Sequence, residues 1–169
     1  SAQTVMNNYI NAIGGKAAIE SITTLQTVSK GKMMGMDATI TVTKTLPNKI
    51  KQDISISTPQ GPMNMVMSYN GTKAYVSQMG QTRDLPAEVA SGLAEQANFA
   101  DILAPEQYGI TYKLIGKENT MGEEAYTVEE TRKDSENKTV HYYSVKTGLL
   151  IKSITTVTAN GQTQSQTVE

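Results

Sequence analysis

The spacing of apolar residues changes near residue 25, from a period of about four to a period of two. Before that point the pattern predicts a helix that Thr4 caps and that ends at residues 14–15, where two glycines follow each other. The apolar residues in helical spacing are Val5, Tyr9 and Ile13. Residues 16–22 predict a second, short helix. The period of two that follows indicates strands with one wet face.

A first group of five strands is predicted between residues 25 and 79. Their ranges are 25–34, 38–43, 49–56, 62–69 and 74–79. Threonines alternate with Ile40 and Val42, and lysines and Asp53 alternate with Ile54 and Ile56. The Asn-Gly pair at residues 70–71 predicts a hairpin between the last two strands.

Residues 85–104 return to helical spacing, and four more strands follow. The predicted strands are 110–116, 124–132, 139–146 and 149–158, and the polar tail 160–169 predicts one more edge strand. Helices and strands do not alternate, so the sheet is expected to be antiparallel, with helices on one face. An open sheet of about nine or ten strands curls. We therefore predict an α+β fold in one domain, residues 1–169, with a curled sheet and a helical lid at 85–104.

Methionines occupy every second position of one predicted strand, at Met63, Met65 and Met67. Six of the nine methionines lie between residues 33 and 67. Flexible thioethers fill an irregular core, line an adaptable apolar pocket, or bind the soft ion Cu(I). These three interpretations remain open at this stage. If a ligand cavity exists, alternation predicts that its lining comprises Ile40, Val42, Ile54, Ile56, Met63, Met65 and Met67, covered by Leu93 and Phe99.

Composition excludes several classes of function. The formal net charge is −1 and the chain has no cysteine, which removes disulfides, thiolate metal sites and a cysteine nucleophile. The sequence has no run of basic residues that would indicate binding to nucleic acid. The single histidine, His141, lies in a predicted strand, and the sequence has no G-x-S-x-G nucleophile elbow with which it could form a catalytic triad. Glu129 and Glu130 are adjacent in another predicted strand, so their side chains point to opposite faces of the sheet. We interpret His141 as a half-exposed strand residue and the glutamates as solvated turn and edge residues, and predict no catalytic residue, cofactor or metal.

The second group of strands resembles the LolA-like and LolB-like superfamily. The resemblance runs over residues 112–153 and includes a Tyr-Tyr strand followed by a turn and a last long strand. Its matching positions are Gly116, Gly122, Ala125, Tyr126, Tyr142, Tyr143, Thr147, Gly148, Leu149, Leu150 and Lys152. Residues 67–77 resemble a hairpin of the same families, and residues 9–33 are similar to the helical start of Bacteroidetes-type members. The order and spacing of these segments carry the resemblance.

The resemblance implies an unclosed half-barrel whose helices plug an apolar concave side. It also implies a periplasmic or outer-membrane-associated protein whose signal peptide or lipobox has been removed. Its partner would be a lipid or lipoprotein acyl chain, bound without chemistry. LolA carriers hold their lid through an arginine, and the arginines of this chain are Arg83 and Arg132.

The leading hypothesis is therefore a non-enzymatic binder of a hydrophobic ligand. The alternatives are an accessory interaction domain of an envelope protease or complex, and a methionine-based Cu(I) site. No partner nucleic acid and no transmembrane segment are expected.

Overall fold

The computed structural model describes residues 1–33, 35–159 and 162–168. The chain divides into two compact units, one made of Ile22–Phe99 and the other of Ser1–Ser21 together with Ala100–Glu169. Each unit contains one antiparallel sheet with a helix packed on one of its faces. The predicted α+β fold of open, curled antiparallel sheets is confirmed, although the strands form two sheets instead of one.

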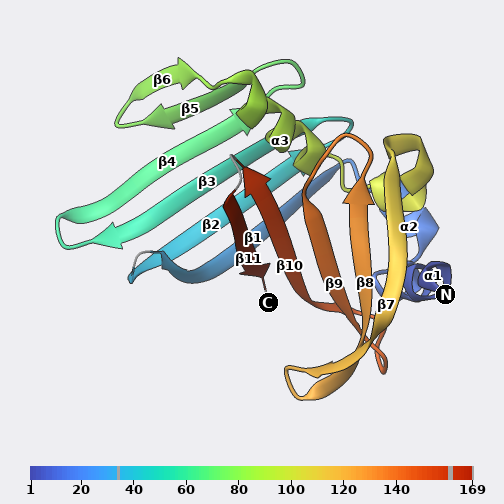
Figure 1. Cartoon of the computed structure of the whole chain (residues 1–169). Coiled ribbons are helices and arrows are strands. Elements are labelled where there is room, and N and C mark those ends of the chain that lie inside the picture. The colour runs from blue at the N-terminus through green and yellow to red at the C-terminus, as the bar shows by residue number, and fades with distance from the viewer. Residues whose placement is uncertain (34, 160–161, 169) are drawn as a thin grey trace. The chain divides into compact units, whose positions relative to one another are not determined.

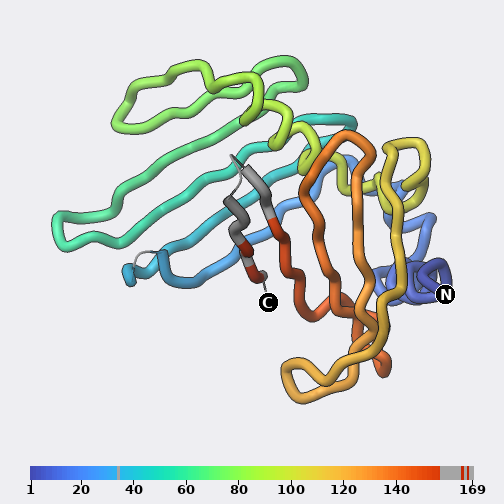
Figure 2. Tube along the Cα trace, viewed as in Figure 1, coloured from blue at the N-terminus to red at the C-terminus, as the bar shows by residue number. Residues whose placement is uncertain are grey.

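The unit Ile22–Phe99 is a meander of six strands followed by a helix. The sheet, here called sheet A, has the order β1-β2-β3-β4-β5-β6, and successive strands are joined by hairpins (Figures 1 and 2). Its elements are β1 (Thr24–Met33), β2 (Met36–Thr45), β3 (Lys49–Thr58), β4 (Gly61–Tyr69), β5 (Ala74–Gln78), β6 (Gln81–Asp84) and α3 (Ala87–Ala97).

The predicted Asn-Gly hairpin joins β4 to β5. The Asn70 side-chain oxygen accepts hydrogen bonds from the backbone N–H groups of Thr72 and Lys73, at 3.0 and 2.9 Å. Gly71 has φ +103°, a value that residues with a side chain rarely adopt. The turn residues therefore fix the register in which Tyr69 faces Ala74.

The other unit combines the N-terminal helices with the C-terminal strands. Its sheet, sheet B, has the order β11-β10-β9-β8-β7. Its elements are α1 (Ala2–Ala12), α2 (Lys16–Ser21), the 3-10 helices η1 (Asp101–Leu103) and η2 (Pro105–Tyr108), β7 (Ile110–Thr120), β8 (Glu123–Arg132), β9 (Lys138–Ser144), β10 (Leu150–Ala159) and β11 (Gln162–Val168). The polar tail thus forms the expected edge strand, and residues 160, 161 and 169 of that prediction lie outside the described residues.

Helix α1 begins earlier than the sequence predicts. Ser1, not Thr4, is the N-cap, and its hydroxyl accepts a hydrogen bond from the Thr4 backbone N–H at 3.3 Å. The buried side chains of Val5 and Met6 pack on Val128 and Tyr143 of sheet B. This cluster is the core of the unit and holds α1 on the sheet.

Candidate functional site

One face of sheet A carries the apolar residues singled out in the sequence. Cross-strand partners lie on the same face of a sheet, and three rows of partners can be followed from β2 through β3 to β4. These rows are Ala38, Ile56 and Met63; Ile40, Ile54 and Met65; and Val42, Gln52 and Met67. The register therefore brings seven of the nine predicted lining residues together on one face.

Two neighbouring clusters divide this face. The first, here called the methionine cluster, has Ala38, Ile54 and Ile56 buried at its centre, and every member comes from β1 to β4. The partly buried members are Met33, Met36, Ile40, Met65 and Met67. Met63, in the outermost row, is 37% exposed.

Helix α3 covers the second cluster. Leu93 and Ala97 are buried against Ile50 and Ala74, with Val42 partly buried beside them. Leu93 therefore packs over the row next to the methionines, and Phe99 is half-buried two residues beyond the end of the helix, outside both clusters as described. The two predicted covering residues are thus separated, and only Leu93 lies within the helix.

A polar contact marks the border between the two clusters. Gln52 is the one polar member of the three rows, and its side-chain N–H donates to the Gln96 side-chain oxygen of α3 at 3.2 Å. The helix is therefore attached to the apolar face by packing on one side and by an exposed amide pair on the other.

The spacing of the methionines bears on the Cu(I) hypothesis. Alternate residues of one strand lie about 7 Å apart, and two strands separated by a third lie roughly 10 Å apart. Methionine sulfurs on such positions meet only if their side chains bend toward one another. Met65 and Met67 are on β4, Met33 and Met36 are at the β1–β2 turn, and β3 between them contributes isoleucines. Cu(I) binding by these sulfurs stays a prediction.

Sheet B carries a chain of hydrogen bonds that sequence reasoning missed. It joins Asp101, Arg132, Glu130, His141 and Ser153, here called the polar chain, across η1, β8, β9 and β10. The successive distances, in that order, are 3.1, 3.0, 2.9 and 2.9 Å. The side chains of Glu130 and His141 are only 14% and 15% exposed, so both are more buried than the sequence suggested.

Proton positions in the polar chain follow from what each group can donate. A carboxylate only accepts, so the Nε2–H of His141 donates to Glu130. In the neutral ring, Nδ1 then accepts from the Ser153 hydroxyl. The signal for this arrangement lay in the register, because His141 is the direct cross-strand partner of Ser153. That pairing cannot be obtained from the alternation within either strand.

The two carboxyl groups that contact Arg132 respond to it in opposite ways. At Asp101 burial dominates and raises the pKa, although the Arg132 charge acts against it. At Glu130 burial also raises the pKa, but the hydrogen bond and charge of His141, together with Arg132, outweigh it and leave the pKa below its usual value. The same guanidinium therefore has one partner that ionises reluctantly and one that ionises readily.

This difference predicts opposite pH dependences for two matched variants. A raised folded-state pKa means that Asp101 contributes stability fully below its ordinary value of 3.8, and loses it as the pH rises through the raised value. The lowered folded-state pKa of Glu130 means that this residue contributes stability at pH values above its ordinary pKa of 4.5. That contribution is lost as the pH falls through the lowered pKa. Urea unfolding between neutral and acid pH should therefore show the deficit of Asp101→Asn growing and that of Glu130→Gln shrinking as the pH falls. Parallel profiles would contradict the assignment.

No protein-family model matches the sequence, and no curated protein matches it. Similar solved structures do exist. A DUF1329 family protein from Desulfovibrio piger has a TM-score of 0.50 and 12% identity, over 96% of this chain and 82% of that one. A LolA superfamily protein from Nitrosomonas europaea has a TM-score of 0.48 and 15% identity, over 96% and 74% of the two chains. The chain is similar to these proteins in fold.

The Mycobacterium tuberculosis lipoprotein LppX is a further similar structure, with a TM-score of 0.44 and 12% identity over 99% of this chain and 93% of that one. The resemblance to LolA-like proteins is thus confirmed at the level of the fold, and at such identities it concerns the fold alone. Among the described residues, none of the helices is both long and apolar enough to cross a membrane.

Proposed function

We propose that this LolA-like protein binds a lipid or lipoprotein acyl chain on the apolar face of sheet A, beside α3, and performs no chemistry on it. The observation that carries the proposal is the methionine cluster, whose members are all sheet residues. Methionine side chains are flexible and polarisable, so such a surface adapts to chains of different length and saturation. An envelope location, periplasmic or associated with the outer membrane, belongs to the same proposal.

The chemistry of an acyl chain suits this face. Each CH₂ group that leaves water contributes about 0.8 kcal/mol, so binding requires no charged anchor. The second cluster, under α3, provides a neighbouring wall that the ligand meets at the Gln52–Gln96 pair. If a bound chain pushes Gln52 and Gln96 apart, water can replace their hydrogen bond at a small net cost, because the pair is exposed and uncharged.

Titration with a fluorescent fatty acid and with a palmitoylated lipopeptide tests the proposal. Met65→Asp places a charge in the cluster, at a partly buried residue opposite Ile54, and is expected to weaken binding by about tenfold or more. The matched control is Met79→Asp, because Met79 is 87% exposed in the β5–β6 turn and Asp suits its φ of +51°. Met65→Gln, close to methionine in shape, repeats the test if the aspartate variant unfolds. The proposal fails if the wild-type protein binds neither probe, or if a folded Met65 variant binds as tightly as the Met79 control.

The second candidate function is an accessory interaction domain with a filled core and no small ligand. It is favoured by the burial of Ile54 and Ile56 at the centre of the methionine cluster, which leaves them already shielded from water. The same titration separates the two functions, since a filled core binds neither fatty acid nor lipopeptide.

A further inference from the structure

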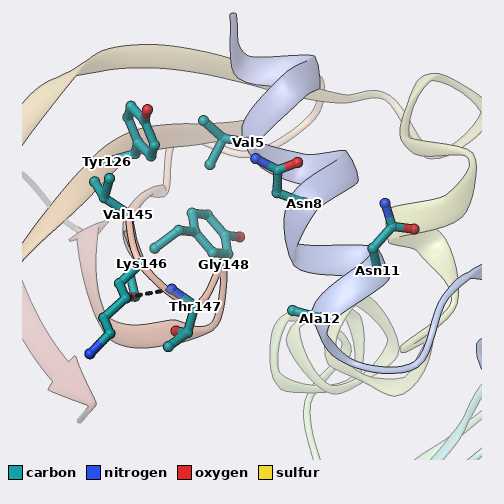
Figure 3. A pocket seen from close by; sticks show the side chains of 11 residues that line it. Val5, Asn8, Asn11, Ala12, Tyr126, Val145, Lys146, Thr147 and Gly148 are labelled. Atoms are coloured by element: carbon teal, nitrogen blue, oxygen red, sulfur yellow. Dashed lines mark hydrogen bonds between the residues drawn. The ribbon is translucent and has the colours of Figure 1, made fainter.

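A pocket of about 410 Å³ lies in the unit that contains sheet B (Figure 3). None of its lining residues belongs to the methionine cluster of sheet A. One wall is α1 and the other is the turn that joins β9 to β10. The lining residues are Val5, Asn8, Asn11, Ala12, Tyr126, Tyr143, Ser144, Val145, Lys146, Thr147 and Gly148. Its volume is ordinary for a site that holds a small molecule.

The helical wall presents two amide side chains, those of Asn8 and Asn11. They are three residues apart and therefore lie on the same side of α1. Both residues are exposed, and within residues 1–33, 35–159 and 162–168 neither side-chain amide has a hydrogen-bond partner in the protein. Each can donate two hydrogen bonds and accept two more. The wall thus offers unused groups of both kinds.

The opposite wall is a turn held in place by its own hydrogen bonds. The Ser144 hydroxyl donates to Glu123 at 2.5 Å and accepts from the Thr147 backbone N–H at 3.1 Å. Gly148 has φ +75°, and a Cβ there would lie only 3.1 Å from the Asn8 carbonyl oxygen. A side chain at this position would crowd the backbone of α1, so glycine suits the close approach of the turn to the helix.

The floor and the charge of the pocket narrow the class of ligand. Tyr126 and Val5 bring an aromatic ring and an apolar side chain to it (Figure 3). Tyr143 is a second aromatic lining residue. Lys146 is the one charged residue in the lining, and it is exposed. A multiply charged anion would therefore find a single, solvated cation. An acyl chain would cover the amides and leave them without hydrogen bonds, which costs about 1–3 kcal/mol per group.

We propose that this pocket binds a saccharide. Adjacent hydroxyl groups of a sugar both donate and accept, as the amides of Asn8 and Asn11 do. The C–H groups of a sugar ring carry slight positive charge and pack on the negative face of an aromatic ring. Tyr126 lines the pocket with such a ring, and the Lys117 ammonium occupies one side of it, 4.8 Å from the ring centroid. The site is separate from the methionine cluster, so it stands or falls independently of acyl-chain binding.

A nuclear magnetic resonance titration of the isotope-labelled chain tests this inference. The probes are glucose, mannose, galactose and N-acetylglucosamine, with inorganic phosphate and octanoate as charged and acyl comparators. At least one sugar is expected to shift the side-chain amide signals of Asn8 and Asn11, with a Kd of about 1 mM for so small a ligand. Asn8→Leu and Asn11→Leu should each weaken that binding about tenfold. Both keep the helix, because leucine has the higher helix propensity.

The matched control is Asn7→Leu, which makes the same change on the same helix at an exposed residue outside the pocket. It is expected to leave the sugar titration unchanged. The inference is overturned if no sugar shifts the Asn8 and Asn11 signals, or if Asn7→Leu weakens binding as much as the pocket variants. It is also overturned if phosphate or octanoate shifts those signals and the sugars do not, since the pocket would then be an anion or acyl site.

Discussion

Replacing Arg132 by methionine is expected to lower the free energy of unfolding by about 3 kcal/mol, the cost of leaving buried partners without their counter-charge. Arg132 donates to Asp101 through Nη2 and to Glu130 through Nε. Both carboxylates are largely buried, and methionine retains the volume of the stem but none of the donors. The loss should exceed that of Asp101→Asn or Glu130→Gln, because each of those removes one partner only.

Arg83→Met is the matched control, since it makes the same change at an exposed residue of the edge strand β6. Its effect on stability should stay within about 0.5 kcal/mol, as for most surface substitutions. Urea unfolding of the two variants at neutral pH measures both effects. Equal losses would show that the polar chain contributes nothing beyond a surface arginine. Of the two arginines, Arg132 is also the one that contacts the predicted helical segment 85–104, through Asp101 of η1.

Truncating Leu93 to alanine is expected to lower the free energy of unfolding by about 3 kcal/mol, within the range for deleting a buried leucine side chain. Leu93 is 4% exposed and is the larger of the two buried residues of α3. The helix has few local sources of stability. Its N-cap, Pro86, makes no side-chain cap hydrogen bond, and Gly92 lies in its interior. Packing on sheet A therefore determines whether α3 stays in place.

Val89→Ala provides the comparison on the same helix, because Val89 is exposed and its truncation removes little buried surface. Urea unfolding gives the loss of stability, and hydrogen exchange of the α3 amides shows where it occurs. We expect faster exchange in α3 for Leu93→Ala than for Val89→Ala. Equal exchange in the two variants would contradict the view that Leu93 anchors the helix.

Alternation along single strands predicted which residues share a face. Ile40, Ile54 and Met65 form a true cross-strand row because the side-chain period of a strand is two, and the connecting turns set the register. The edge strand β6 was not predicted, because strand prediction depends on alternation of apolar and polar residues. Its residues, Gln-Thr-Arg-Asp, are all polar and exposed, so they show no alternation.

Features that depend on pairing between strands could not be obtained in this way. The partition of the strands into two sheets is decided by which edges meet, and no local pattern records it. The polar chain needs Ser153 directly opposite His141 on one side and Glu130 diagonally across from it on the other, and the identities of Glu130 and His141 alone suggested partly exposed positions. The sugar pocket likewise requires the approach of Gly148 to Asn8, which are 140 positions apart in the sequence.

The discontinuity of the second unit has a consequence for synthesis. Residues 22–99 form an uninterrupted unit and can fold as soon as they leave the ribosome. Helix α1 leaves the ribosome before this unit does, yet the residues on which Val5 and Met6 pack, Val128 and Tyr143, are made more than a hundred residues after it. Helix α1 must therefore wait with its apolar side uncovered until the strands that carry these residues have been made. During that interval it is the segment on which a chaperone would act.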